Sequence, residues 1–208
     1  MRSIVLISAL AFAFSAIDLH AQATPPAVKV NLKRTTVGEQ PTPQYNAGAV
    51  KEKRWRPKNW IEVDVEFDIK VPAEAGGNKG SYGALKVNIY LATQHVNKEG
   101  KRTVLKGSFD VVSIPAGESS HVLAYVSPAN LRAIFQKDNV TASTDIQGWG
   151  VEVLADGQRV AGDSSLGKEA WWETKKDAFE ISEGMLVHKS KTPFSILWGD
   201  YDLPVQAQ

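Results

Sequence analysis

The chain has 208 residues, a formal net charge of +1 and no cysteine. A charge this close to zero provides no overall basic field for nucleic acid or anionic lipid, so we expect neither as a partner. The absence of cysteine excludes disulfides and a lipid-acceptor cysteine, and the chain is long enough to bury a core without such cross-links.

The first 23 residues have the pattern of a signal peptide. Arg2 precedes an apolar run at 4–17, which is too short to cross a membrane comfortably as a helix. Ala21-Gln22-Ala23 matches the small-x-small pattern of a cleavage site, so we expect cleavage after Ala23; an uncleaved anchor is the alternative. Export without cysteine favours a bacterial periplasm or cell surface, and we expect no stable membrane span after cleavage.

Residues 24–58 are expected to form an N-terminal strand followed by a basic linker arm. Val28, Val30 and Leu32 alternate with polar residues, as in a strand. A loop rich in proline and glycine then leads to a basic cluster around Trp55, made of Lys51, Lys53, Arg54 and Arg56. The remaining residues, 59–208, are expected to form one β-sandwich domain.

The strongest strand signal lies at 60–71. Apolar side chains at odd positions alternate with charged side chains at even positions: Ile61, Val63, Val65, Phe67, Ile69 and Val71 against Glu62, Asp64, Glu66, Asp68 and Lys70. Because successive side chains of a strand point to opposite faces, this pattern predicts an antiparallel sheet with one face on the core and one in water.

Other short strands, turns and one helix follow this strand. Alternating or apolar-rich runs occur at 85–91, 103–114, 121–126, 149–154, 158–163, 179–181, 185–188 and 194–198. Asp156-Gly157 predicts a hairpin that pairs Val153 with Val160, and Gly107 is a candidate β-bulge. Ser127-Pro128 predicts the start of a short helix, and a helical turn is expected at 168–173.

These elements predict an all-β fold. About eight to ten strands at this spacing favour an immunoglobulin-like antiparallel β-sandwich with one short helix, and a jelly-roll sandwich is the alternative. No strand–helix–strand alternation is present, so a parallel sheet is not expected.

Glu62, Asp64, Glu66 and Asp68 form an acidic ladder on the outward face of the 60–71 strand. Alternate side chains of a strand are about 7 Å apart, which is too far for one calcium ion. We expect either a solvated face paired with Lys86, Lys106 or another neighbouring cation, or a contact for a basic partner. The spacing of the histidines and acidic residues predicts no metal site, and without a nucleophile motif we expect no cofactor and no enzymatic activity.

Two sets of residues are candidates for contact surfaces. Trp55, Trp171 and Trp172 lie in segments of weak strand character and are candidate glycan or partner contacts, with core packing as the alternative. Lys51, Lys53, Arg54 and Arg56 are expected to pair with the acidic ladder of a neighbouring copy, which would give a homo-oligomer; a solvated loop is the alternative.

The export signal, the absence of cysteine, the Trp-Ile-Glu-Val-Asp-Val-Glu-Phe-Asp-Ile strand and the strand count together resemble a known class of proteins. The chain is similar to small secreted immunoglobulin-like proteins associated with type IV pilus gene clusters of Verrucomicrobia. This resemblance implies a non-enzymatic surface or pilus-associated protein that contacts other such proteins and self-associates. The sequence departs from a pilin in one respect: no long apolar helix follows the predicted cleavage site, so incorporation as a pilin subunit is not expected.

Overall fold

The computed structural model describes residues 28–45, 48–49, 51, 53–167 and 170–206. The predicted signal peptide and its cleavage site lie outside these residues. Within them, no helix is long and apolar enough to cross a membrane.

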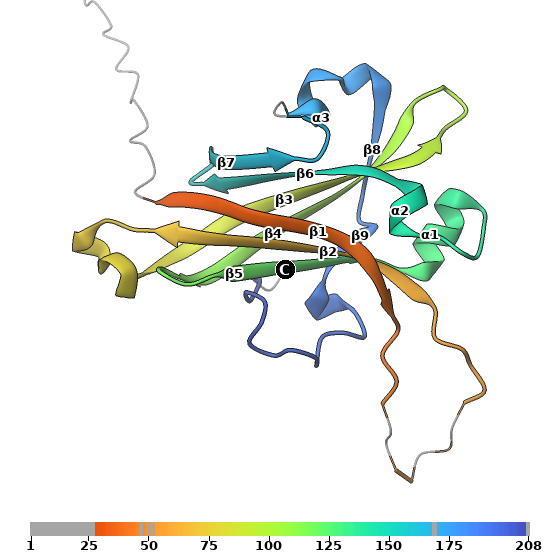
Figure 1. The fold of residues 1–208 in the computed structure, drawn as a ribbon, viewed down its shortest axis with the longest axis horizontal. Coiled ribbons are helices and arrows are strands. Elements are labelled where there is room, and N and C mark those ends of the chain that lie inside the picture. Colours follow the sequence, from red (N-terminus) through yellow and green to blue (C-terminus); the bar gives the residue numbers. More distant parts are fainter. Residues whose placement is uncertain (1–27, 46–47, 50, 52, 168–169, 207–208) are drawn as a thin grey trace, which may run out of the picture.

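Two β-sheets pack face to face in the described part of the chain (Figure 1). The first sheet has the order β1 (Lys29–Pro41), β2 (Asn59–Lys70), β5 (Ser120–Val126) and β9 (Leu186–His188). The second has the order β7 (Gln158–Ser164), β6 (Ile146–Ala155), β3 (Ser81–Val96), β4 (Arg102–Pro115) and β8 (Phe179–Glu183). The predicted all-β sandwich is confirmed.

The strand order is that of an immunoglobulin-like sandwich. Strands β1, β2 and β5 occupy the positions of A, B and E in one sheet, and β3, β6 and β7 occupy those of C, F and G in the other. One pair departs from the expected antiparallel arrangement, because β8 runs parallel to β4.

The core lies between the sheets and follows the alternation predicted for β2. Ile61, Val63, Val65 and Phe67 are fully buried, whereas the acidic side chains between them are only partly buried. Inward side chains of β3, β4, β5 and β6 complete the same cluster. Burial of each such side chain stabilises the folded state by about 1.5–3 kcal/mol. A one-residue slip would move these side chains to the outer face, so their burial fixes the register of the sheet.

Short helices connect the strands. Helix α1 (Pro128–Phe135) begins as predicted, because the Ser127 side chain accepts a hydrogen bond from the Asn130 backbone N–H at 3.2 Å. The helical turn predicted at 168–173 forms as the one-turn helix α3 (Trp171–Thr174), whereas the one-turn helix α2 (Ala142–Asp145) was not predicted. Four 3-10 turns complete the set: Ala73–Ala75, Gly77–Lys79, Lys176–Ala178 and Lys189–Lys191.

The β6–β7 hairpin turns at Asp156-Gly157, as predicted. Both residues have positive φ, 51° and 76°, which matches the tight turns of two-residue hairpins. The predicted register was wrong by one residue: Val153 pairs with Ala161, because the register shifts between Val153 and Leu154. Gly107 forms no bulge and pairs regularly with Ile89; an added Cβ there would lie 2.6 Å from the Phe109 ring.

The N-terminal strand is part of the sandwich. Strand β1 pairs with β2 from Lys29↔Lys70 to Pro41↔Asn59, with one irregularity between Leu32 and Arg34. The expected division at residue 58 therefore separates two strands of one sheet. We name the loop at 42–58 the basic loop; its described residues extend away from the strands (Figure 1).

The C-terminal part of the chain contacts both sheets. Strand β8 lies beside β4, β9 lies beside β5, and Val205 forms a bridge with Val111 of β4. We name residues 189–206 the C-terminal segment. The strand predicted at 194–198 was wrong: this stretch forms turns, with the Leu197 N–H donating to the Phe194 carbonyl at 2.9 Å.

Candidate functional site

The acidic ladder lies beneath part of the C-terminal segment instead of facing open water. Phe194 is buried on the outer face of the first sheet, where its ring stacks on Tyr125 at 4.5 Å and meets the edge of Trp60 at 5.7 Å. Leu123 belongs to the same outer cluster. The expected two-faced strand is therefore apolar on its inner side and covered by aromatic residues on part of its outer side.

Each carboxylate of the ladder has a partner within the chain. Glu62 accepts from the Tyr125 hydroxyl at 2.5 Å and Glu66 from the Ser119 hydroxyl at 2.9 Å. Asp64 accepts from the Tyr201 hydroxyl at 2.8 Å and lies 2.9 Å from His121 Nδ1, and Asp68 pairs with Lys33 at 2.8 Å. The partners expected from the sequence, Lys86 and Lys106, lie in the second sheet and pair with Asp110 and Glu183.

These contacts change the proton affinities of the groups involved. The hydrogen bond from Lys33 lowers the pKa of Asp68. Burial, together with the hydrogen bond to Glu62, raises the pKa of Tyr125, and burial together with Asp64 raises the pKa of Tyr201 to about 12. Both tyrosines therefore act as hydrogen-bond donors to the ladder at neutral pH.

A pocket of about 240 Å³ lies between the ladder and the C-terminal segment, and we name it the aromatic pocket. Trp198 and Tyr201 line it and remain 46% and 44% exposed. Its other lining residues are Gln40, Glu62, Asp64 and Leu123. The His121 ring stacks on Tyr201 at 4.1 Å, so one aromatic wall is held in place.

Trp198 has an unusual backbone conformation for a bulky residue. Its φ is 50°, in the left-handed region that costs about 1–2 kcal/mol for residues other than glycine. The ammonium group of the buried Lys189 donates to the Trp198 carbonyl at 2.9 Å and also forms an ion pair with Asp202. The buried ion pair therefore stabilises the backbone conformation that exposes the Trp198 ring.

His188 completes the buried polar group behind this turn. Its Nε2 lies 3.4 Å from the Asp202 carboxylate, and its Nδ1 accepts from the Ser190 backbone N–H at 3.2 Å. Burial lowers the pKa of His188, although Asp202 opposes this shift. The ring therefore favours the neutral form at neutral pH.

Trp171 and Trp172 are not available as glycan contacts. Each is only 3% exposed. Trp172 stacks on Tyr90 at 4.6 Å and occupies the space above Gly150, where a Cβ would lie 2.1 Å from its ring. Trp171 donates its ring N–H to Ser164 at 2.8 Å. Core packing, the alternative for this pair, is what the structure shows.

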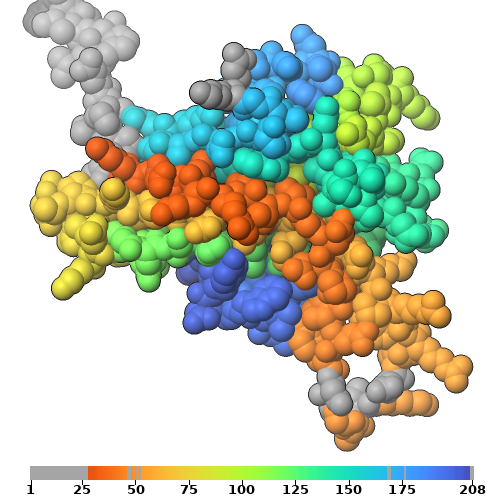
Figure 2. All heavy atoms as spheres, viewed as in Figure 1, coloured from red at the N-terminus to blue at the C-terminus, as the bar shows by residue number. Residues whose placement is uncertain are grey.

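The basic loop is the most exposed of the predicted contact segments. Trp55 is 51% exposed, and Lys51, Lys53, Arg54 and Arg56 are also exposed. Within the part of the chain that the structure describes, none of these four cations forms an ion pair. The loop borders the C-terminal segment (Figure 2), and the Tyr45 hydroxyl donates to the Pro193 carbonyl at 2.6 Å.

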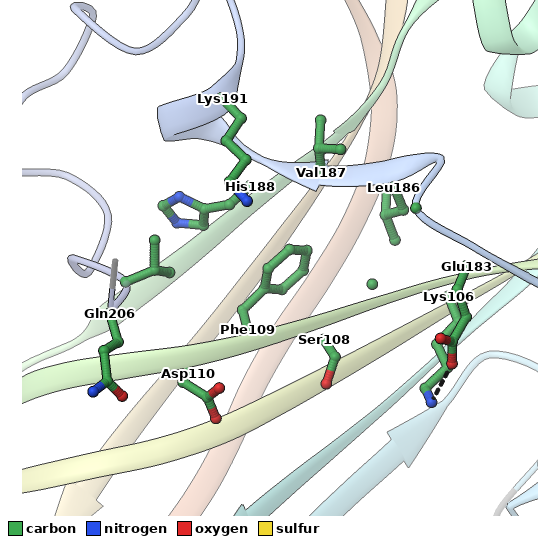
Figure 3. Close-up of a pocket in the computed structure, with 13 residues that line it drawn as sticks. Lys106, Ser108, Phe109, Asp110, Glu183, Leu186, Val187, His188, Lys191 and Gln206 are labelled. Atoms are coloured by element: carbon green, nitrogen blue, oxygen red, sulfur yellow. Dashed lines mark hydrogen bonds and ion pairs between the residues drawn. The ribbon is translucent and has the colours of Figure 1, made fainter. Parts of the chain in front are cut away.

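A second pocket of about 290 Å³ lies between β4 and β9 (Figure 3). Phe109, Leu186 and His188 line it, and Lys106 pairs with Glu183 at one end. The Ser108 hydroxyl donates to Asn88 at 2.5 Å and points away from His188, so these two residues form no nucleophile–base pair. Among the described residues, no group of three or more histidine, aspartate or glutamate side chains is close enough to hold a metal ion.

The sequence interpretation missed Trp198, Tyr201 and Gln40. Trp198 ends the strand predicted at 194–198, although it is followed by Gly199, Asp200 and Asp202. Glycine and aspartate are typical of turns, so this composition favours an exposed loop that carries aromatic residues.

A protein-family model matches residues 21–208. The chain belongs to the family that this model defines. The fold is similar to a crystal structure of a protein from Akkermansia muciniphila, with a TM-score of 0.72 and 24% sequence identity over 87% of this chain and 94% of that one. No curated protein matches the chain. Akkermansia muciniphila is a Verrucomicrobium, and the pilus-associated proteins that the sequence resembles also occur in Verrucomicrobia. At 24% sequence identity, the similarity between the two structures concerns the fold.

Proposed function

We propose that this chain is an exported, non-enzymatic immunoglobulin-like protein that acts at the bacterial surface through contacts with other proteins. The role is structural or adhesive, and pilus-associated proteins are the expected class of partner. Its family, the fold shared with a protein of Akkermansia muciniphila and the signal-peptide pattern at 1–23 support this proposal.

The basic loop is the observation that carries the proposal. It presents an exposed indole and several cations that have no ion-pair partner among the described residues. Tryptophan and arginine are enriched at protein interfaces, and unpaired cations favour a partner with an acidic surface.

Binding of the mature protein to purified pili and to outer-membrane proteins of the same bacterium tests this function. Surface plasmon resonance should show binding that weakens at least about tenfold when Arg54, Trp55 and Arg56 are replaced by alanine, because interface hot spots of this kind contribute most of the affinity. Lys98→Ala with Lys175→Ala is the matched control, since both lysines are exposed and lie elsewhere. Equal binding by both variants, or no binding at all, would contradict the proposal.

Carbohydrate binding is the second candidate function. The exposed ring of Trp198 favours it, because an open aromatic face beside carboxylate and amide groups suits a sugar ring and its hydroxyls. Trp55 remains a candidate as well. Intrinsic fluorescence titrations with a broad oligosaccharide panel test this candidate: a response that Trp198→Ala or Trp55→Ala removes would support it.

A further inference from the structure

The aromatic pocket lies at the base of the basic loop. Gln40 lies near the end of β1 and Glu62 near the start of β2, and the basic loop connects these two strands. Each copy of the protein therefore carries a pocket and, on the loop that begins at its rim, a set of exposed cations.

The chemistry of the pocket favours a cation. Within the described residues, neither Glu62 nor Asp64 has a lysine or arginine partner; Asp64 contacts only His121 among basic groups. Indole and phenol rings attract cations over their faces, and a carboxylate binds a guanidinium through two parallel hydrogen bonds. A neutral sugar could stack on the ring faces and donate its hydroxyls to the carboxylates, but it would leave the two negative charges without a counter-charge.

The pocket is also held in its open form by the fold. Trp198 keeps its left-handed backbone, and buried Lys189 donates to its carbonyl. Strained residues of this kind occur preferentially at binding sites, where the surrounding structure maintains them. This observation is independent of charge, and it points to Trp198 as a residue that is positioned to contact a ligand.

The loop of the same copy does not supply that cation. It runs away from the sandwich (Figure 1), and the described cations of the loop form no ion pair with Glu62 or Asp64. Arg54 and Arg56 are instead exposed on either side of Trp55, where another molecule can contact them.

We propose that the aromatic pocket of one copy binds an arginine or lysine side chain from the basic loop of a second copy. The inference rests on the proposed contact function and names a partner for it. Two copies related by a two-fold axis each place a loop over the other's pocket, so the interface closes at a dimer. Exposed ion pairs are individually weak, so the dimer is weak and salt-sensitive, with Trp55 adding apolar contact.

Sedimentation velocity of the mature protein at low and high salt tests the dimer. We expect dimerisation at low salt and a Kd at least about tenfold higher near 0.5 M salt, because screening weakens exposed charge pairs. Arg54→Glu with Arg56→Glu should abolish the dimer, and Glu62→Gln with Trp198→Ala should weaken it at least about tenfold. Lys98→Glu with Lys175→Glu makes the same change in charge at exposed positions elsewhere and should leave the dimer intact.

Mixing the two variants distinguishes loss of contact from loss of folding. The loop variant retains its pocket and the pocket variant retains its loop, so a mixture restores one of the two contacts and should form a weaker dimer.

A wild-type protein that stays monomeric at high concentration and low salt would overturn the inference, as would a dimer that neither variant affects. A monomer with a Trp198-dependent response to oligosaccharides would identify the pocket as a sugar site instead. A monomer that still binds pili would overturn this inference alone and leave the proposed function standing.

Discussion

Val65 illustrates the stability that one inward residue of β2 provides. Its side chain is fully buried between the sheets. Val65→Ala should lower the free energy of unfolding by about 1–3 kcal/mol, through lost burial and the cavity that remains. Urea unfolding measures the change, and Lys70→Ala, at the exposed end of the same strand, should change the stability by less than about 0.5 kcal/mol. Equal losses from both variants would mean that the alternation of β2 does not decide its stability.

His188 makes the stability of the protein depend on pH. Burial lowers its pKa, with Lys189 and Lys191 adding to the shift and Asp202 opposing it. The unfolded chain therefore takes up a proton more readily, and the free energy of unfolding should decrease as pH falls below the ordinary histidine pKa of about 6.5. The melting temperature, measured between about pH 7.5 and pH 5, should fall on acidification.

His188→Asn provides the comparison, because the asparagine side chain offers an acceptor to the Ser190 N–H but does not titrate. This variant should melt with a flatter dependence on pH than the wild type. His95→Asn, at a histidine outside the buried group, should retain the wild-type dependence. A wild-type slope in His188→Asn would assign the effect to another group.

At the scale of single elements, the β6–β7 turn depends on the left-handed conformation of Gly157. Its φ is 76°, and no heavy atom would lie within 4 Å of an added Cβ, so strain alone should decide the effect of a substitution. Gly157→Ala should destabilise the protein by about 1 kcal/mol. Gly38→Ala, in open space with an ordinary φ, is the control, and thermal melts compare the two. A neutral Gly157→Ala would mean that the turn relaxes into another geometry.

The elements that the sequence predicts well are those with local causes. Alternation in β2, the capping serine of α1 and the Asp156-Gly157 turn all act within a few residues, and each forms as expected. The positions that failed depend on distant partners. Trp172 is buried because Gly150, on another element, leaves room for its ring, and nothing near Trp172 in the sequence indicates this.

The candidate site, too, could be predicted from the sequence only in part. The sequence identifies Glu62 and Asp64 as outward residues of a strand, which the structure confirms. It does not show that a segment more than a hundred residues away covers them, because the contacts of Phe194 with Tyr125 and of Tyr201 with Asp64 arise only in the folded chain. The pocket between these segments is therefore a tertiary feature.

At the scale of the whole molecule, the C-terminal part of the chain protects surfaces of both sheets. Strand β9 covers the edge of β5, Phe194 covers Tyr125, and the backbone at Pro204 accepts a hydrogen bond from Val112 of β4 at 3.0 Å. Uncovered strand edges and exposed aromatic side chains favour association between chains. Residues 184–206 therefore cover β5 and part of the outer face of the first sheet, which keeps these surfaces from pairing with another chain.

Deleting residues 184–208 tests this role. The shortened chain keeps β8 but exposes Leu123, Tyr125 and the edge of β5, so we expect a lower melting temperature, increased binding of an apolar dye and association that high salt does not reverse. Phe194→Ala, which keeps the backbone cover but removes the buried ring, should show the dye binding and a loss of about 3–5 kcal/mol with less association. Size-exclusion chromatography distinguishes the two variants. A shortened chain that stays monomeric and melts like the wild type would mean that strands β1 to β8 are stable without the C-terminal residues.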